Sequence, residues 1–222
     1  MKSQQSGFTL VEIAIVLVII GLLLGGILKG QELINSAKVK NLANDFRVIP
    51  TYIYAYQDKF KSLPGDDAQV TTHVTGSTLS TVGPVGNGVI NGAWNAAAGS
   101  NEESILFWQH VRLANLASGP TLVTDATYIP TNATGGKLGI SSATTGNIQI
   151  SGMTGTYQVC SAGILGKFAK QLDIQMDDGN TSTGSMRAVA DGAAMGAAAI
   201  SNTVAPPAGI DDAANYTVCM TF

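Results

Sequence analysis

The chain has 222 residues, of which only 12% are charged, and its formal net charge is −3. This length is sufficient for one long helix and one globular domain, and the charge gives no basic footprint, so nucleic acid is not indicated as a partner. Glycine is abundant at 26 residues and aromatic residues make up only 6%, which favours a loop-rich domain with small side chains. The chain lacks the Gly-x-Ser-x-Gly, His-Glu-x-x-His and phosphate-loop signatures, so we do not expect an enzyme.

The N-terminal segment is the most informative part of the sequence. A polar leader at residues 1–7 contains Lys2, and an apolar run from Phe8 to Leu28 follows, interrupted by Glu12. As a helix, this run of about 21 residues is about 32 Å long, which is enough to cross the hydrocarbon core of a bilayer. A carboxylate at the centre of such a helix costs about 2.5–3.5 kcal/mol, and less near an end, so Glu12 is a candidate functional residue.

The residues Gly7-Phe8-Thr9-Leu10-Val11-Glu12 resemble the prepilin processing motif of type IV pilins and type II secretion pseudopilins. The resemblance implies that a prepilin peptidase cuts between Gly7 and Phe8 and that Phe8 is then N-methylated. It also implies that Glu12 meets the N-terminal amine of a neighbouring subunit in a filament. A buried pair of this kind adds little stability over an apolar pair but selects between packing arrangements.

The same resemblance implies the partners and the location. The precursor is expected to cross the inner membrane once and then to join a homo-oligomeric helical filament with the help of inner-membrane assembly machinery. A pilus subunit, or pilin, would form an extracellular filament for adhesion, motility or DNA uptake. The alternatives are a minor pilin, a pseudopilin of a short periplasmic filament in protein secretion, and, in a different class, a membrane-anchored periplasmic binding module.

Two general rules give other interpretations of this segment. A secretory signal would be cut after its apolar region at small residues, but the nearest such stretch, Asn35-Ser36-Ala37, is a poor site. Lys29, Lys38 and Lys40 follow the run, whereas only Lys2 precedes it. The positive-inside rule alone would therefore place the C-terminal side in the cytoplasm, and we give the processing motif precedence.

The helical pattern continues beyond the apolar run. We expect one helix from Phe8 to Phe60, with a hydrophobic half at residues 8–30 and an amphipathic half at residues 31–61. In the second half, apolar residues recur at steps of mostly three and four, which predicts a stripe that faces a globular domain; the stripe consists of Leu33, Ile34, Ala37, Leu42, Phe46 and Ile49. Pro50 is expected to bend or interrupt the helix.

Residues 62–222 are expected to form a globular pilin-like domain of the α+β class, with an antiparallel sheet packed on the long helix. Two further helices are predicted at residues 100–116, where Ser100 and Glu103 form a capping box, and at residues 163–176. Alternating or apolar segments predict strands at residues 122–123, 138–140, 147–150, 156–160, 186–190 and 215–222.

The chain has two cysteines, Cys160 and Cys219. One pair in an exported chain predicts one disulfide, and the alternative is two buried free thiols. The disulfide would close a loop of about 60 residues and stabilise the domain by about 4 kcal/mol in the chain-entropy model.

Two acidic pairs, Asp66-Asp67 and Asp177-Asp178, are candidate cation ligands. Neither has the spacing of an EF-hand, so we expect solvated turns and no cofactor, with calcium as the alternative. His110 is expected to be a packing or surface residue of its helix rather than a ligand, and His73 is expected to have no acidic or cysteine neighbour with which to form a metal site.

Overall fold

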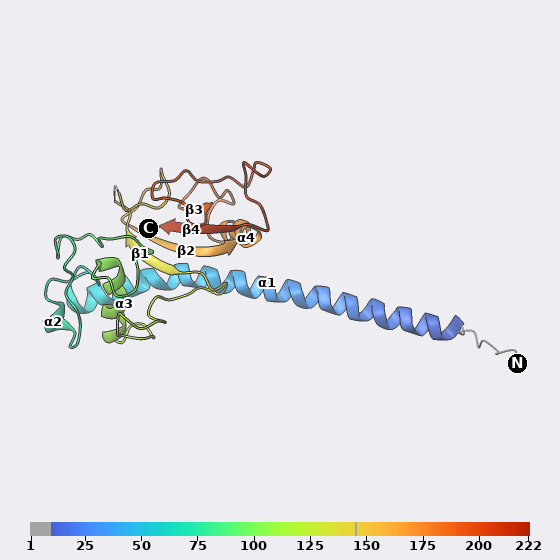
Figure 1. Ribbon diagram of the computed structural model, residues 1–222, viewed down its shortest axis with the longest axis horizontal. Helices are drawn as coiled ribbons and strands as arrows, with labels where there is room; N and C mark the ends of the chain where they lie inside the picture. Colours follow the sequence, from blue (N-terminus) through green and yellow to red (C-terminus); the bar gives the residue numbers. More distant parts are fainter. Residues whose placement is uncertain (1–9, 145) are drawn as a thin grey trace, which may run out of the picture. The chain divides into compact units, whose positions relative to one another are not determined.

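The long helix α1 (Leu10–Phe60) begins the part of the chain that the computed structural model describes, which comprises residues 10–144 and 146–222. The chain divides into two units, one that ends at Lys38 and one that comprises Val39–Phe222. The first unit contributes a helix only. The second contains the rest of α1 and all the other elements (Figure 1).

A four-stranded antiparallel sheet forms the centre of the second unit, with β1 (Leu138–Ser142), β2 (Tyr157–Leu165), β3 (Met186–Ala190) and β4 (Asn215–Thr221) in the order β1-β2-β4-β3. Strands β2 and β4 are therefore central. Three helices complete the unit: α2 (Val70–His73), α3 (Glu103–Leu113) and α4 (Gly166–Met176). The expected α+β class is confirmed, with a long N-terminal helix and an antiparallel sheet.

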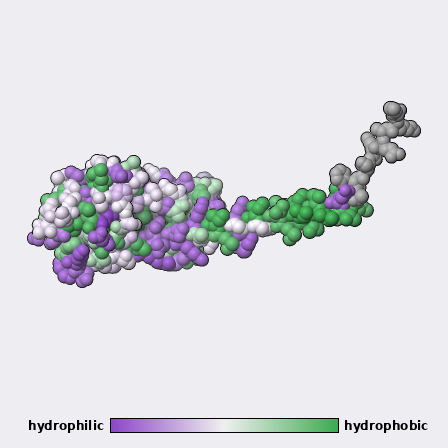
Figure 2. Space-filling view, turned by 90° about the horizontal axis from the view of Figure 1, so that it is seen from below, coloured by the Kyte–Doolittle hydropathy of each residue, from purple (hydrophilic) through white to green (hydrophobic). Residues whose placement is uncertain are grey.

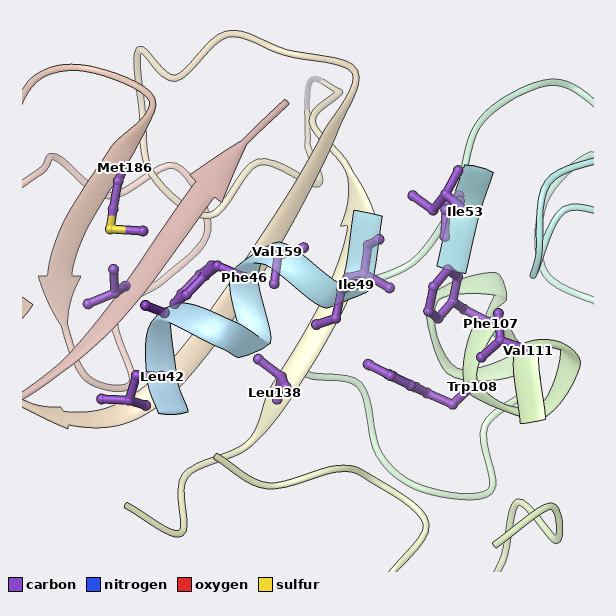
Figure 3. Packing of buried hydrophobic residues seen from close by; sticks show 14 of the residues in the cluster. Leu42, Phe46, Ile49, Ile53, Phe107, Trp108, Val111, Leu138, Val159 and Met186 are labelled. Atoms are coloured by element: carbon purple, nitrogen blue, oxygen red, sulfur yellow. The ribbon is translucent and has the colours of Figure 1, made fainter. Parts of the chain in front are cut away.

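The two faces of the sheet bury different clusters of side chains because successive residues of a strand point to opposite faces. On β2, Val159 belongs to the main core, which contains the buried stripe of α1, and Cys160 belongs to a smaller cluster with Trp94 and Ile150. Figure 3 shows how side chains of α1, α3 and the sheet meet in the main core. The sheet thus connects α1 on one side to the loops on the other.

The predicted disulfide between Cys160 and Cys219 is confirmed. The two residues lie directly opposite each other on the central strands β2 and β4, and both are buried. The bond encloses α4, β3 and the loops between them, so it joins the two ends of this long excursion.

The buried stripe of α1 begins later than the sequence pattern indicates. Leu33 and Ile34 are more than half exposed, and Ala37 is exposed as well. The buried residues of α1 start at Val39 and continue at helical spacing: Val39, Leu42, Ala43, Phe46, Ile49, Ile53 and Tyr56. The apolar residues of α1 before Val39 therefore share the helical period but are exposed in the described part of the chain.

Of the two effects expected of Pro50, the interruption of α1 is wrong, because the helix continues through this residue. A proline inside a helix removes one backbone hydrogen bond and costs about 3 kcal/mol. Phe46, Ile49 and Ile53, on both sides of Pro50, are all buried in the main core. Their packing offsets the local cost and keeps the helix intact.

The predicted capping box of Ser100 and Glu103 is also wrong. Helix α3 starts at Glu103, no side chain caps it, and the hydroxyl of Ser100 is buried without a hydrogen bond. Instead, the carbonyl of Asn91 accepts from the backbone N–H of Ser104 at 3.0 Å. A loop that lies earlier in the chain therefore caps α3, and no local sequence pattern predicts this capping.

Two predicted strands are wrong, and one boundary differs. Residues 122–123 form no strand, and residues 147–150 form only an isolated bridge between Ile150 and Ala197, because the N–H of Gln149 donates to the side chain of Gln158 instead. Strand β2 runs on to Leu165, so α4 begins at Gly166 rather than at residue 163. Pairing of Ile164 and Leu165 with β4 accounts for this difference.

The disulfide has a measurable consequence. We expect the full-length double variant Cys160→Ala/Cys219→Ala, in detergent, to unfold with a free energy about 4 kcal/mol lower than that of the oxidised chain. Urea titration followed by circular dichroism measures this difference. Reduction of the unsubstituted chain serves as the control and should give a similar loss, whereas equal midpoints for all three samples would contradict the stabilising role of the bond.

Candidate functional site

Apart from Glu12, the surface of α1 between Leu10 and Leu28 is apolar on all sides. The large hydrophobic side chains of this segment are exposed. By length and composition, α1 is the one helix among the described residues that could cross a membrane. Figure 2 shows this hydrophobic surface, in contrast to the mixed surface of the second unit. A helix that is hydrophobic all round belongs in a membrane or in the core of an assembly.

Glu12 lies in the first turn of α1 as the structure describes it. A carboxylate near a helix N-terminus is favoured by the partial positive charge of the backbone there. Gly7 and Phe8, the predicted cleavage position, lie outside the described residues. The candidate assembly surface therefore consists of Glu12 and the apolar side chains that follow it.

In the second unit, the turn at Asp66 and a distant glycine-rich loop are held together. One oxygen of Asp66 accepts from the backbone N–H groups of Gly86 and Asn87, and the other accepts from that of Gly88 at 2.7 Å. This carboxylate is buried, so the expected solvated turn is wrong here. Its oxygens accept from backbone donors, which offsets the cost of burying an acidic residue at this position.

Asp67 has an equally complete set of partners. Its carboxylate accepts from the Tyr56 hydroxyl at 2.9 Å and from the N–H of Gln69 at 2.9 Å, and it lies 2.7 Å from Nδ1 of His73. Burial opposes ionisation, but the hydrogen bonds from His73, Gln69 and Tyr56 outweigh it and lower the pKa of Asp67. The expectation that His73 has no acidic neighbour is therefore wrong, since the fold brings Asp67 to it.

His110 packs inside α3, as expected, and is fully buried. Its Nδ1 accepts from the N–H of Gly65 at 2.9 Å, and its Nε2 lies 2.9 Å from the carbonyl of Thr78. Because Nδ1 accepts and a carbonyl cannot donate, the ring is neutral with its proton on Nε2. Burial lowers the pKa of His110 accordingly, and the ring acts as a structural link between two loops.

Glu103, at the start of α3, is fully buried. One carboxylate oxygen accepts from the backbone and side-chain amides of Asn91, at 2.7 and 2.9 Å. Burial is the largest cause that raises the pKa of Glu103 to about 7, and the nearby Asp66 raises it further against the effect of Asn91. The side chain therefore changes its charge near neutral pH.

The two acidic pairs that the sequence singles out thus differ. Asp66 and Asp67 serve the internal network, whereas Asp177 and Asp178 come together with a third carboxylate, Asp173, in one group. Asp173 was not predicted, although it precedes Asp177 by four residues and so shares its helix face.

The comparisons with known proteins concern the N-terminal segment. The family model of the prokaryotic N-terminal methylation motif matches residues 2–28, a range that includes Gly7, Phe8 and Glu12. This match covers the N-terminal segment only and is consistent with a type IV pilin-like or pseudopilin precursor; the motif implies processing by a prepilin peptidase and pilus-type assembly. No curated protein and no solved structure matches the chain.

The buried Glu103 predicts a change of stability with pH. Since its pKa in the folded chain, about 7, lies above the ordinary 4.5, the folded state binds the proton more tightly than the unfolded state. Its contribution is complete below about pH 4.5 and is lost as the pH rises through 7, a loss on the order of 2–3 kcal/mol. We expect Glu103→Gln, which imitates the protonated form, to remove this loss.

The measurement compares the free energy of unfolding at pH 5 and at pH 8 for the unsubstituted chain and for Glu103→Gln. Groups other than Glu103 titrate in both chains and cancel in the difference. Glu102→Gln is the control, since Glu102 is the acidic residue adjacent in sequence. Equal pH dependence in all three chains would contradict the prediction.

Proposed function

We propose that this chain is a structural subunit of a type IV pilus-like extracellular filament, made as a membrane-anchored precursor and assembled through α1. The observation that carries the proposal is the apolar surface from Leu10 to Leu28 directly behind a methylation motif. Adhesion, motility or DNA uptake would be the task of the assembled filament. No catalytic step is required of the chain in this function.

The driving force for assembly is helix packing. The apolar segment stays out of water both in the membrane and in a filament core, so the hydrophobic effect adds little to the exchange. Association of helices in lipid depends instead on close van der Waals contact, which small residues permit. Gly21, Gly25, Gly26 and Gly30 lie in α1, and a side chain added at any of them would meet no neighbouring atom within the chain. These positions are therefore available for close approach by another subunit.

Glu12 would set the register between subunits. Cleavage after Gly7 would create a cationic amine on Phe8, about one helical turn from Glu12. A carboxylate among apolar side chains is costly, and an ammonium group from an adjacent helix relieves that cost in one axial alignment only. The pair thus selects the stagger of the subunits rather than supplying most of the binding energy.

Electron microscopy of material sheared from the cell surface, with antibodies against this chain, tests the proposal. Abundant filaments that contain the chain along their length support a pilus subunit. Traces at filament ends indicate a minor pilin, and filaments confined to the periplasm indicate a pseudopilin. A processed chain that never polymerises would leave the membrane-anchored binding module and refute the proposal.

Processing has its own test. We expect Gly7→Ala to block cleavage, so that the unprocessed chain accumulates in the membrane. Mass spectrometry of the purified chain measures this directly, because loss of residues 1–7 and methylation of Phe8 both change the mass. Ser6→Ala serves as the matched control on the other side of the cleavage position. Normal-length mature protein from Gly7→Ala would refute cleavage at this glycine.

The register function of Glu12 is tested separately. We expect Glu12→Ala to be cleaved normally but to yield roughly tenfold fewer filaments or less, since it leaves the amine of a neighbour without its partner. Glu32→Gln is a suitable control, because Glu32 lies on the same helix, is exposed and pairs with Lys29 at 2.6 Å. Unimpaired filaments from Glu12→Ala, counted by electron microscopy, would rule out this function.

A further inference from the structure

Three carboxylates gather where α4 ends. Asp173 lies in the last turn of this helix, Asp177 is its C-terminal cap, and Asp178 follows. One oxygen from each of the three side chains lies within 4.8 Å of the others. The group is remote in sequence from the methylation motif and is independent of the proposed assembly function.

Asp173 is the unusual member of this group. Its side chain is only 1% exposed, while that of the next residue, Ile174, is 68% exposed, so the carboxylate faces inwards and the isoleucine faces outwards. Neither oxygen of Asp173 has a partner in hydrogen-bonding geometry. Buried polar groups in folded proteins are nearly always hydrogen-bonded, and an ionised carboxylate in such a place is costly without a compensating charge.

The surroundings increase this cost. Like charges four residues apart on a helix repel each other, and the C-terminus of a helix carries a partial negative charge that disfavours anions. Among the described residues, no ion pair involves any of the three carboxylates. Arg187 exerts some attraction on Asp178, but its guanidinium donates to the carbonyls of Gly184 and Ser151. The negative charge of the group is thus not balanced.

The loop after α4 nevertheless holds the other two carboxylates in place. Asp177 accepts from the backbone N–H of Met186 at 2.7 Å. Gly184 has a φ of +69° and approaches so closely that a Cβ atom there would clash with Asp177 Oδ2. Asp178 accepts from the N–H of Asn180 at 2.9 Å and from the hydroxyl of Thr183 at 2.6 Å. Each carboxylate oxygen has a second lone pair, so these bonds leave capacity for a further partner.

We propose that Asp173, Asp177 and Asp178 together bind a divalent cation, with Ca²⁺ as the preferred ion. A donor set made of oxygen atoms alone selects hard cations over zinc or copper. Oxygen atoms that all lie within 4.8 Å of one another can contact a single ion. Ca²⁺ accepts oxygen ligands at about 2.3–2.6 Å in flexible geometry, whereas Mg²⁺ demands a near-ideal octahedron at about 2.0–2.1 Å, so three carboxylates completed by waters suit Ca²⁺ better.

The competing state is a neutral Asp173. Burial is the largest cause that raises the pKa of this carboxyl to about 6; Asp178 and Asp177 raise it further, while the amides of Gly179 and Asn180 oppose the rise. A protonated Asp173 would need no cation. The experiment is therefore done at pH 7.5, and its outcomes separate the two states.

The full chain in detergent is first treated with a chelator and then titrated with CaCl₂, up to about 5 mM, above the weakest affinities of extracellular calcium modules. We expect the melting temperature to rise by roughly 5–10 °C once the Ca²⁺ concentration is about 100-fold above the dissociation constant. Isothermal titration calorimetry should give one Ca²⁺ per chain and weaker binding of Mg²⁺. No heat and no shift with either ion would overturn the proposal.

The variants make the test specific. We expect Asp173→Asn to melt higher than the unsubstituted chain in chelator, because it removes an uncompensated buried charge, and to lose the response to Ca²⁺. Asp178→Asn, at an exposed position, keeps the fold and should weaken binding by about tenfold, because affinity depends on the number of charged ligands. Asp58→Asn, an exposed acid on α1, is the matched control and should keep the full response. A response of Asp173→Asn equal to that of the control would place any bound Ca²⁺ elsewhere and refute the site.

Discussion

The apolar surface between Leu10 and Leu28 constrains this protein more than any other feature. Fourteen large hydrophobic residues of this segment are exposed in the single chain. At about 1.5–3 kcal/mol for each such side chain, their exposure to water would cost on the order of 20 kcal/mol or more. That exceeds the roughly 5–15 kcal/mol by which a folded domain is stable. The segment therefore needs a membrane or other copies of itself, and the methylation motif at residues 2–28 agrees with both.

The same helix has a second function after Lys38. From Val39 to Tyr56 only one face is apolar, and that face forms part of the main core with the sheet and α3. This packing allows Pro50 to remain within a continuous helix. One helix thus serves two environments, and the position where burial begins marks the change between them.

Acidic residues that look alike in the sequence have different uses in the second unit. Asp66 accepts from backbone donors of a distant loop, and Asp67 connects α1 to α2 through Tyr56 and His73. Asp173 accepts no hydrogen bond of good geometry and faces two other carboxylates. The difference depends on the groups that surround each carboxylate in the fold. Hydrogen-bond donors offset the free-energy cost of burying a charge, whereas neighbouring carboxylates increase it.

The sequence alone determined the features that depend on local pattern. The apolar run, the motif around Gly7 and Glu12, the long helix to Phe60, the α+β class and the pairing of two cysteines all follow from periodicity, spacing or resemblance. The tertiary structure decided what depends on partners far along the chain. These features include the capping of α3 by Asn91, the contact between His73 and Asp67, and the start of the buried stripe at Val39. They could not be predicted because a hydrogen bond or a core contact needs both groups in place, and only the folded chain brings together residues that are many positions apart.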